Sequence, residues 1–232
     1  MSIAPSGKPA LAGMPWLPYI LPFAAFIAFL ALEHLLPVDP VLVYPIRAVT
    51  VTILLALFSR HVIDFHARHV AGSVALGIAV FVIWVAPDVL WPAWRAHWLF
   101  QNSVLGSIRT DVPPVLKSSL LFIVFRTYGC VIMVPILEEL FWRGWLARWL
   151  IDADDFRRVP LGAYTMGSFW IGSILFASEH GPYWEVGLLA GIAYNWWMRR
   201  TRSLGDAILT HAVTNGCLSA YVLAADKWHY WF

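Results

Sequence analysis

Long apolar stretches alternate with short polar segments along the chain, and several approach the roughly 20 residues that a helix needs to cross a bilayer. Taken as membrane spans, they lie at 16–36, 44–58, 70–85, 116–150, 162–180, 184–198 and 204–224. The pattern predicts an all-α fold, a polytopic transmembrane bundle of about seven or eight helices. Residues 1–232 are expected to form a single integral membrane domain.

Two parts of this pattern need separate treatment. As one helix, the stretch 116–150 would reach roughly 50 Å, which exceeds the bilayer core, so we expect tilt, protrusion or a kink at Pro135. If the stretch breaks in two, the bundle has one helix more. The long loop before it contains tryptophans, Arg95 and His97, which are typical of a segment lying in the headgroup layer.

The composition agrees with a membrane protein. Hydrophobic residues make up 60% of the 232 residues and charged residues only 13%, which excludes an ordinary water-soluble globule. The formal net charge is +2 and no glycine-rich phosphate loop occurs, so no nucleic-acid partner is expected. Cys130 and Cys217 both lie in apolar segments, and a disulfide framework is not indicated. The expected surroundings are the lipid bilayer.

The lysines and arginines of the loops predict the orientation. With seven spans, one face carries Lys8, Arg60, Arg68, Arg157, Arg158, Arg199, Arg200 and Arg202, and the other carries Arg95, Arg109, Lys117 and Lys227. Because positively charged loops favour the cytoplasmic side, the amino terminus is expected in the cytoplasm. The first span has no small-residue cleavage site behind it and is expected to stay as a helix.

Two adjacent carboxylates, Glu138 and Glu139, interrupt the apolar stretch "MVPILEELFWRGWLARW". Ionisable residues at membrane depth are costly and usually face the bundle interior, so each is a candidate functional residue. Glu139 and Arg143 are four residues apart, in the favourable order for an ion pair along one helical face. Glu138 points about 100° away and lacks that partner, so it would be free to exchange protons. The structural alternative is that both glutamates are paired groups or lie at the membrane surface.

Two later spans carry further polar residues. Phe176 and His180 are one turn apart near the end of one span, and His211 and Asn215 are one turn apart near the middle of another. A lone histidine on an apolar helix is more often a satisfied core residue than a catalyst. Polar side chains from three helices, however, gain by converging on one wet cavity. Together with Glu138 they predict a site with a base and several hydrogen-bond donors.

In this order the residues resemble the CAAX protease and bacteriocin-processing family of intramembrane proteases, which includes the Rce1-type prenyl protease. The matching motifs are Glu138-Glu139-x-x-x-Arg143, Phe176-x-x-x-His180 and His211-x-x-x-Asn215, and the resemblance covers about 118–224. The segments "YILPFAAFIAFLALE" and "YPIRAVTVTILLALF" further resemble a bacterial branch called CAAX prenyl protease-related, often met alongside exosortase sorting systems. The resemblance implies a membrane-associated peptide or protein substrate, a bacterial inner (plasma) membrane and a link to an exosortase system.

The resemblance also implies catalytic roles. Glu138 and His180 would hold and deprotonate a water that attacks the scissile carbonyl, and His211 and Asn215 would stabilise the oxyanion. This chemistry is reasonable on its own terms, because a desolvated carboxylate is a competent base at neutral pH. Two donors on one helical face can be aimed at the developing charge in advance.

The remaining motif residues would support these groups. By the same resemblance, Glu139 with Arg143 would form the supporting ion pair and Phe176 would pack beside the water site. A serine nucleophile fits poorly, because Ser178 lies about 200° around the helix from His180.

Three alternatives stay open. Glu138, His180 and His211 would make a zinc site with an open position for water, although no His-Glu-x-x-His occurs and the resemblance favours a metal-free pair, so no cofactor is expected. A proton-coupled transporter would use the same residues as a relay, but no internal repeat is present. The third alternative is a non-proteolytic membrane scaffold, against which the intact motifs argue.

Overall fold

The computed structural model describes residues 14–35, 37–108 and 111–231, so Lys8, Leu36 and Arg109, which enter the predictions above, lie outside the described residues. The α-helices are α1 (Leu17–Leu32), α2 (Pro40–Leu54), α3 (Val70–Leu90), α4 (Pro114–Ser118), α5 (Leu120–Tyr128), α6 (Val134–Glu139), α7 (Ala147–Trp149), α8 (Met166–Ser178), α9 (Trp184–Thr201) and α10 (Leu204–Ala225). Over these ranges the chain forms eight helices, with α5 to α7 taken as one, and no strands. The predicted all-α bundle is confirmed.

The longest helix is a rod that runs without interruption over Leu120–Trp149, 30 residues in all. Two wider, π-helical segments separate α5, α6 and α7 within it, at Gly129–Met133 and Leu140–Leu146. The rod begins later than predicted because Ser119 is extended (φ −81°, ψ 109°) and its hydroxyl caps the helix by accepting the Phe122 N–H. The predicted stretch therefore breaks at Ser119, into α4 and the rod, and continues as helix through Pro135.

Five helical segments in the described part of the chain are long and apolar enough to cross a membrane. They are Leu17–Leu35, Pro40–Ser59, Val70–Leu90, Leu120–Trp149 and Leu204–Ala225. The predicted span 162–180 corresponds to α8, which has only 13 residues. It begins at Met166 because Thr165 and Ser168 form a reciprocal capping box, and it ends before His180. The predicted span 184–198 corresponds to α9, which is likewise not among the five.

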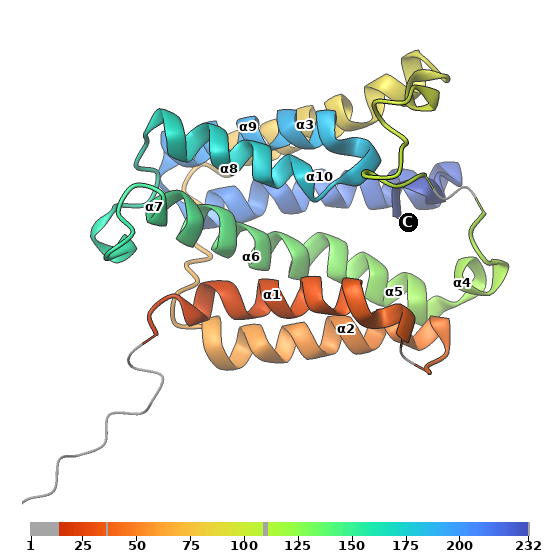
Figure 1. Ribbon diagram of the computed structural model, residues 1–232, viewed down its shortest axis with the longest axis horizontal. Coiled ribbons are helices and arrows are strands. Elements are labelled where there is room, and N and C mark those ends of the chain that lie inside the picture. The colour runs from red at the N-terminus through yellow and green to blue at the C-terminus, as the bar shows by residue number, and fades with distance from the viewer. Residues whose placement is uncertain (1–13, 36, 109–110, 232) are drawn as a thin grey trace, which may run out of the picture.

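The helices lie on two sides of the rod (Figure 1). On one side α1 and α2 run next to each other, and α2 packs on α5. On the other side α10 packs along α3, and α8 packs along α9. Because α10 also contacts α6, the polar residues of α6 and α10 face each other inside the bundle.

Large apolar side chains cover the outside of the bundle. Examples from four different helical segments are the exposed Leu30, Ile53, Leu57, Val82 and Ile174. Exposed apolar surface of this extent is unstable in water but favourable against lipid chains. Together with the five long apolar segments, it identifies an integral membrane protein in a lipid bilayer.

The connection between α3 and α4 contains a buried arginine, Arg95. Trp98 and Val104 are exposed there, as expected for a headgroup segment, but only 5% of Arg95 is exposed. Its guanidinium turns inward because it pairs with Asp88 at 2.7 Å and with Glu185 at 2.8 Å. The Arg95 side chain is therefore an internal part of the protein, and the depth of this segment in the membrane stays a prediction.

Candidate active site

Glu139 is the fully buried centre of a polar cluster inside the bundle. Its Oε1 accepts from Arg143 Nη1 at 3.1 Å, so the ion pair predicted from their spacing is present. The same oxygen lies 2.9 Å from His211 Nδ1 on α10. One carboxylate thus joins the rod to α10 across a separation of 72 residues in sequence.

Arg143 extends this cluster to α9. Its Nε donates to Asn195 Oδ1 at 2.9 Å and its Nη2 to the Gly191 carbonyl at 3.3 Å. Its guanidinium also lies over the Phe176 ring, 4.7 Å from the centroid. With every nitrogen bonded, the buried Arg143 fixes the rod against α8 and α9.

Glu138 points away from the ion pair, as the helical offset predicts. It is buried, and its Oε2 lies 4.0 Å from His211 Nε2. That oxygen makes no hydrogen bond within the described chain. The two neighbouring glutamates therefore approach opposite nitrogens of one imidazole, and only Glu139 is tied to an arginine.

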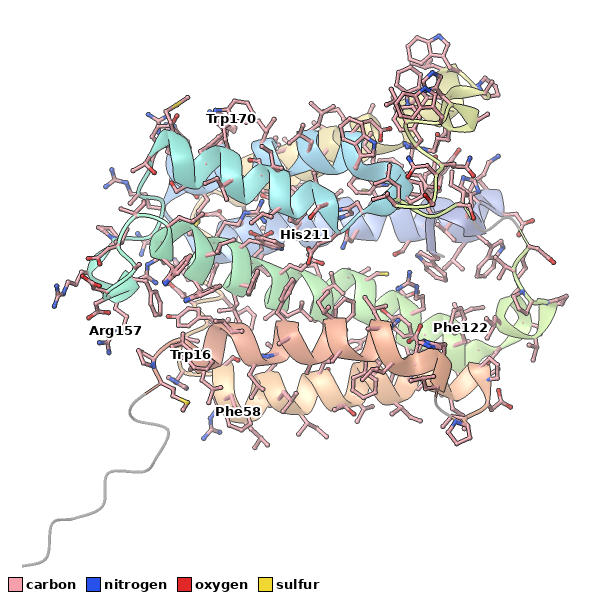
Figure 2. The ribbon with its side chains drawn as sticks, viewed as in Figure 1. Trp16, Phe58, Phe122, Arg157, Trp170 and His211 are labelled. Atoms are coloured by element: carbon pink, nitrogen blue, oxygen red, sulfur yellow. The ribbon has the colours of Figure 1, made fainter. Side chains whose placement is uncertain are left out.

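His211 lies in the middle of the bundle, beside α6 (Figure 2). Tyr194 stacks on its ring at 4.9 Å and 29°, and Phe176 approaches the ring edge-on at 6.1 Å. If Nδ1 donates to Glu139, Nε2 carries a proton only when the ring is an imidazolium. Donation from Nε2 toward a substrate oxygen thus requires the positively charged ring.

His180 occupies the turn that follows α8, just beyond the last helical residue. Its Nδ1 lies 2.8 Å from the Phe176 carbonyl oxygen, which can only accept, so Nδ1 carries the proton and Nε2 is left as an acceptor. Gly187 permits this position, because a Cβ there would lie 3.0 Å from Nδ1.

Asn215 contacts the rod where Pro135 changes its hydrogen bonding. Pro135 has no N–H, and the Val134 N–H bonds Gly129 instead of Cys130. The Cys130 carbonyl is thereby free to accept from Asn215 Nδ2, at 2.9 Å. The amide nitrogen has two hydrogens, so one remains for another acceptor.

The structure brings most of the predicted residues into one network. Direct contacts join Glu138, Glu139, Arg143, Phe176 and His211, and His180 joins through Phe176. Asn215 lies one turn beyond His211 and contacts the rod. Sequence reasoning missed Tyr194 and Asn195, for which the polar pair inside "AGIAYNWWM" was the available signal.

The alternative zinc set does not come together here. Among the residues that the structure describes, no three His, Cys, Asp or Glu side chains are placed to hold one metal ion. The residues of the predicted set thus do not fit a zinc site in this arrangement.

Comparison with known proteins supports the resemblance carried by the motifs. No curated protein and no solved structure matches the chain. Residues 117–217 match the family named Rce1-like, which is described as type II CAAX prenyl endopeptidase Rce1-like. All three motifs fall in this range, whereas the exosortase branch and an exosortase link stay predictions. Over residues 117–217, the chain is therefore similar to the Rce1-like family.

Proposed function

We propose that this protein is an intramembrane endopeptidase that hydrolyses a peptide bond of a membrane-associated substrate with a water activated by Glu138 and His180. The observation that carries the proposal is the difference between two neighbouring carboxylates. Through Oε1, Glu139 pairs with Arg143 at 3.1 Å and with His211 at 2.9 Å. Among the described residues, the buried Glu138 has only the 4.0 Å approach to His211 as an ion pair, although Oε2 lacks a hydrogen bond in both glutamates. The family's description as a prenyl endopeptidase supports the same reaction class.

Glu138 and His180 would share the proton of the attacking water. As the water oxygen bonds to the scissile carbonyl carbon, its proton passes to the Glu138 carboxylate, with His180 Nε2 as a second acceptor. The tautomer required of His180 is the one that its bond to the Phe176 carbonyl favours. When the carbon–nitrogen bond breaks, the stored proton passes to the leaving amine.

The carbonyl oxygen gains negative charge in this step and needs donors. His211 Nε2 would supply one, because Glu139 at Nδ1 compensates the charge of the imidazolium. The remaining Nδ2 hydrogen of Asn215 would supply the other. Both residues lie on one face of α10, which is a rigid support for the pair.

The substrate can be identified by comparing membrane-protein termini in cells that make the wild-type chain or Glu138→Gln. An endopeptidase leaves an uncleaved species that accumulates with Glu138→Gln, and mass spectrometry of its new termini names the cleaved bond. The purified protein should cleave that peptide in proteoliposomes. If no terminus changes, and the liposomes instead show proton flux that depends on Glu138, the relay alternative replaces this proposal.

Asn215→Ala tests the oxyanion pair. A donor that acts on a charge present only in the transition state contributes little to substrate binding, so kcat should fall by roughly 10² to 10³ with KM within a few-fold. Steady-state kinetics should be corrected for the folded fraction, because the variant also loses its bond to the Cys130 carbonyl. A raised KM with an intact kcat would make Asn215 a substrate-binding residue instead.

Chelation tests the metal-free reaction. Exhaustive chelation should leave the cleavage rate unchanged, and elemental analysis of the purified protein should find far less than one zinc per chain. The glutamate and histidine then act directly on water. Loss of activity on chelation, restored by one equivalent of zinc, would make the protein a zinc-dependent protease.

We further propose a bacterial inner membrane as the location, with the amino terminus in the cytoplasm. Support comes from the basic loops, of which Arg157 and Arg158 lie in the exposed α7–α8 connection. A single cysteine placed at Arg158 of a chain without Cys130 and Cys217 should resist an impermeant maleimide in intact cells. One placed at Val104 should react, and the opposite pattern would invert the orientation.

A further inference from the structure

Arg95 is a buried arginine in the α3–α4 connection, outside the residues that match the family. This connection extends from the end of the bundle beyond α3 (Figure 1). The three motifs do not involve it, and the hydrolytic steps proposed above do not use it. A buried charge is costly unless it is paired, so its arrangement needs a physical account.

Three protein segments meet at the Arg95 guanidinium. Nε pairs with Asp88 at the end of α3, at 2.7 Å, and Nη1 pairs with Glu185 in the first turn of α9, at 2.8 Å. Nη1 also donates to the Pro182 carbonyl at 2.8 Å. The plane of the guanidinium lies over the Tyr183 ring, 4.1 Å from its centroid.

The segment held in this way is the turn that begins at His180. Pro182 and Tyr183 belong to the 3-10 turn Gly181–Tyr183, and the Tyr183 N–H donates to the His180 carbonyl at 2.9 Å. Trp84 of α3 contacts both ends of the turn, with ring centroids 5.1 Å from His180 and 6.4 Å from Tyr183.

The same connection touches the turn at a second place. The backbone of Gly181 has φ +48°, and a Cβ there would lie only 3.0 Å from the Leu105 carbonyl oxygen. Asp88, the partner of Arg95, also accepts from the Tyr230 hydroxyl at 2.7 Å. The turn is thus held from α3, from the connection and from the carboxyl-terminal segment.

We propose that Arg95 is a positioning residue for His180: it fixes the turn after α8, and thereby holds the imidazole at the water site. Each contact supports this reading. The carbonyl bond and the Glu185 pair set the turn and the start of α9, and the Asp88 pair ties both to α3. Misplacement of a catalytic group by about 1 Å can lower a rate on the order of 100-fold.

Arg148 offers a matched control. It also uses its guanidinium to hold a connection, donating to the carbonyls of Val159 at 2.7 Å and Arg157 at 3.3 Å, and it lies over the Phe156 ring at 5.1 Å. It fixes the α7–α8 connection at the opposite end of α8. If both arginines only stabilise the fold, their alanine variants should affect His180 equally. If Arg95 positions His180, only the Arg95 variant should change its modification rate.

The experiment compares Arg95→Ala, Arg95→Lys and Arg148→Ala in the full chain. The first readout is the rate at which diethyl pyrocarbonate modifies His180, followed by mass spectrometry, with the exposed His61 of the α2–α3 connection as the internal reference. This readout needs no activity, which matters because the proposal rests on the hydrolytic function proposed for His180. The second readout is kcat and KM per folded molecule.

Arg95→Ala should change the modification rate of His180 several-fold and lower kcat by roughly 10- to 100-fold, with KM within a few-fold. Arg95→Lys keeps the charge but not the planar guanidinium, so the variant should fold. Its His180 modification rate and its kcat should lie between those of Arg95→Ala and wild type. Arg148→Ala should lower thermal stability but change neither the His180 modification rate nor kcat.

Unchanged modification of His180 in folded Arg95→Ala, or equal effects in Arg148→Ala, would overturn the positioning role. If Arg95→Ala does not fold, Arg95→Lys decides by the same two readouts. If the wild type cleaves no peptide, the hydrolytic function fails, while the modification rate still reports whether Arg95 holds His180.

Discussion

Glu138→Gln is expected to abolish peptide cleavage while the protein still inserts and folds. Glutamine preserves the shape of the side chain but cannot take a proton, and a positioned general base contributes typically 10² to 10⁴ in rate. The substitution should be well tolerated, because Glu138 Oε2 makes no hydrogen bond among the described residues and lies 4.0 Å from His211 Nε2. The fold is therefore expected to tolerate the loss of the Glu138 carboxylate.

The measurement is initial rate in proteoliposomes, with thermal stability in detergent as the check on folding. Glu33→Gln is the matched control, because Glu33 pairs with Arg47 at 2.8 Å through its carboxylate, near the end of α1. It should retain wild-type turnover. Cleavage at the wild-type rate in Glu138→Gln would end the glutamate hypothesis, whatever the behaviour of the control.

Local spacing predicted the part of the site that lies on a single helix. The interval between Glu139 and Arg143 fixes their contact, because side chains four apart share a helical face. The offset between Glu138 and Glu139 likewise predicts that they point to different groups. The long apolar stretches predicted the bundle for a similar reason, since length and composition suffice to identify a helix in lipid.

Contacts between distant segments did not follow from spacing. His211 approaches both glutamates although 72 residues separate it from Glu139, and no periodicity in one sequence reveals that pairing. Asn195 and Arg143 are 52 residues apart and present the same difficulty. The burial of Arg95 was not predicted either, because its acidic partners lie far away in sequence or on another helix, at Asp88 in α3 and Glu185 in α9.

The Pro135 region shows how a local signal can have a distant effect. The sequence predicts a disturbance of the helix at this proline, and the structure absorbs it as a wider turn at Gly129–Met133. The consequence is an unpaired carbonyl at Cys130, which Asn215 satisfies from α10. Pro135, three residues before Glu138, thus leaves the carbonyl through which the rod binds Asn215 of α10.

Arg143→Ala is expected to destabilise the protein more than any other single change in the site. The buried guanidinium bonds Glu139, Asn195 and the Gly191 carbonyl, so its removal leaves a buried carboxylate without its cation and breaks the link to α9. Removing one partner of a buried ion pair typically costs about 3 to 5 kcal/mol. Thermal stability in detergent should fall far more than in Glu138→Gln, which removes no such pair.

A double variant separates the lost charge pair from the lost packing. Arg143→Ala combined with Glu139→Gln leaves no uncompensated charge, so it should recover part of the stability lost in Arg143→Ala alone. The recovery should be incomplete, because Asn195 and the Gly191 carbonyl still lack their donor and the guanidinium no longer covers the Phe176 ring. Equal melting temperatures for wild type and Arg143→Ala would show that Glu139 is solvated instead. His211 would then lack a fixed carboxylate at Nδ1, and its proposed role as an oxyanion donor would lose its support.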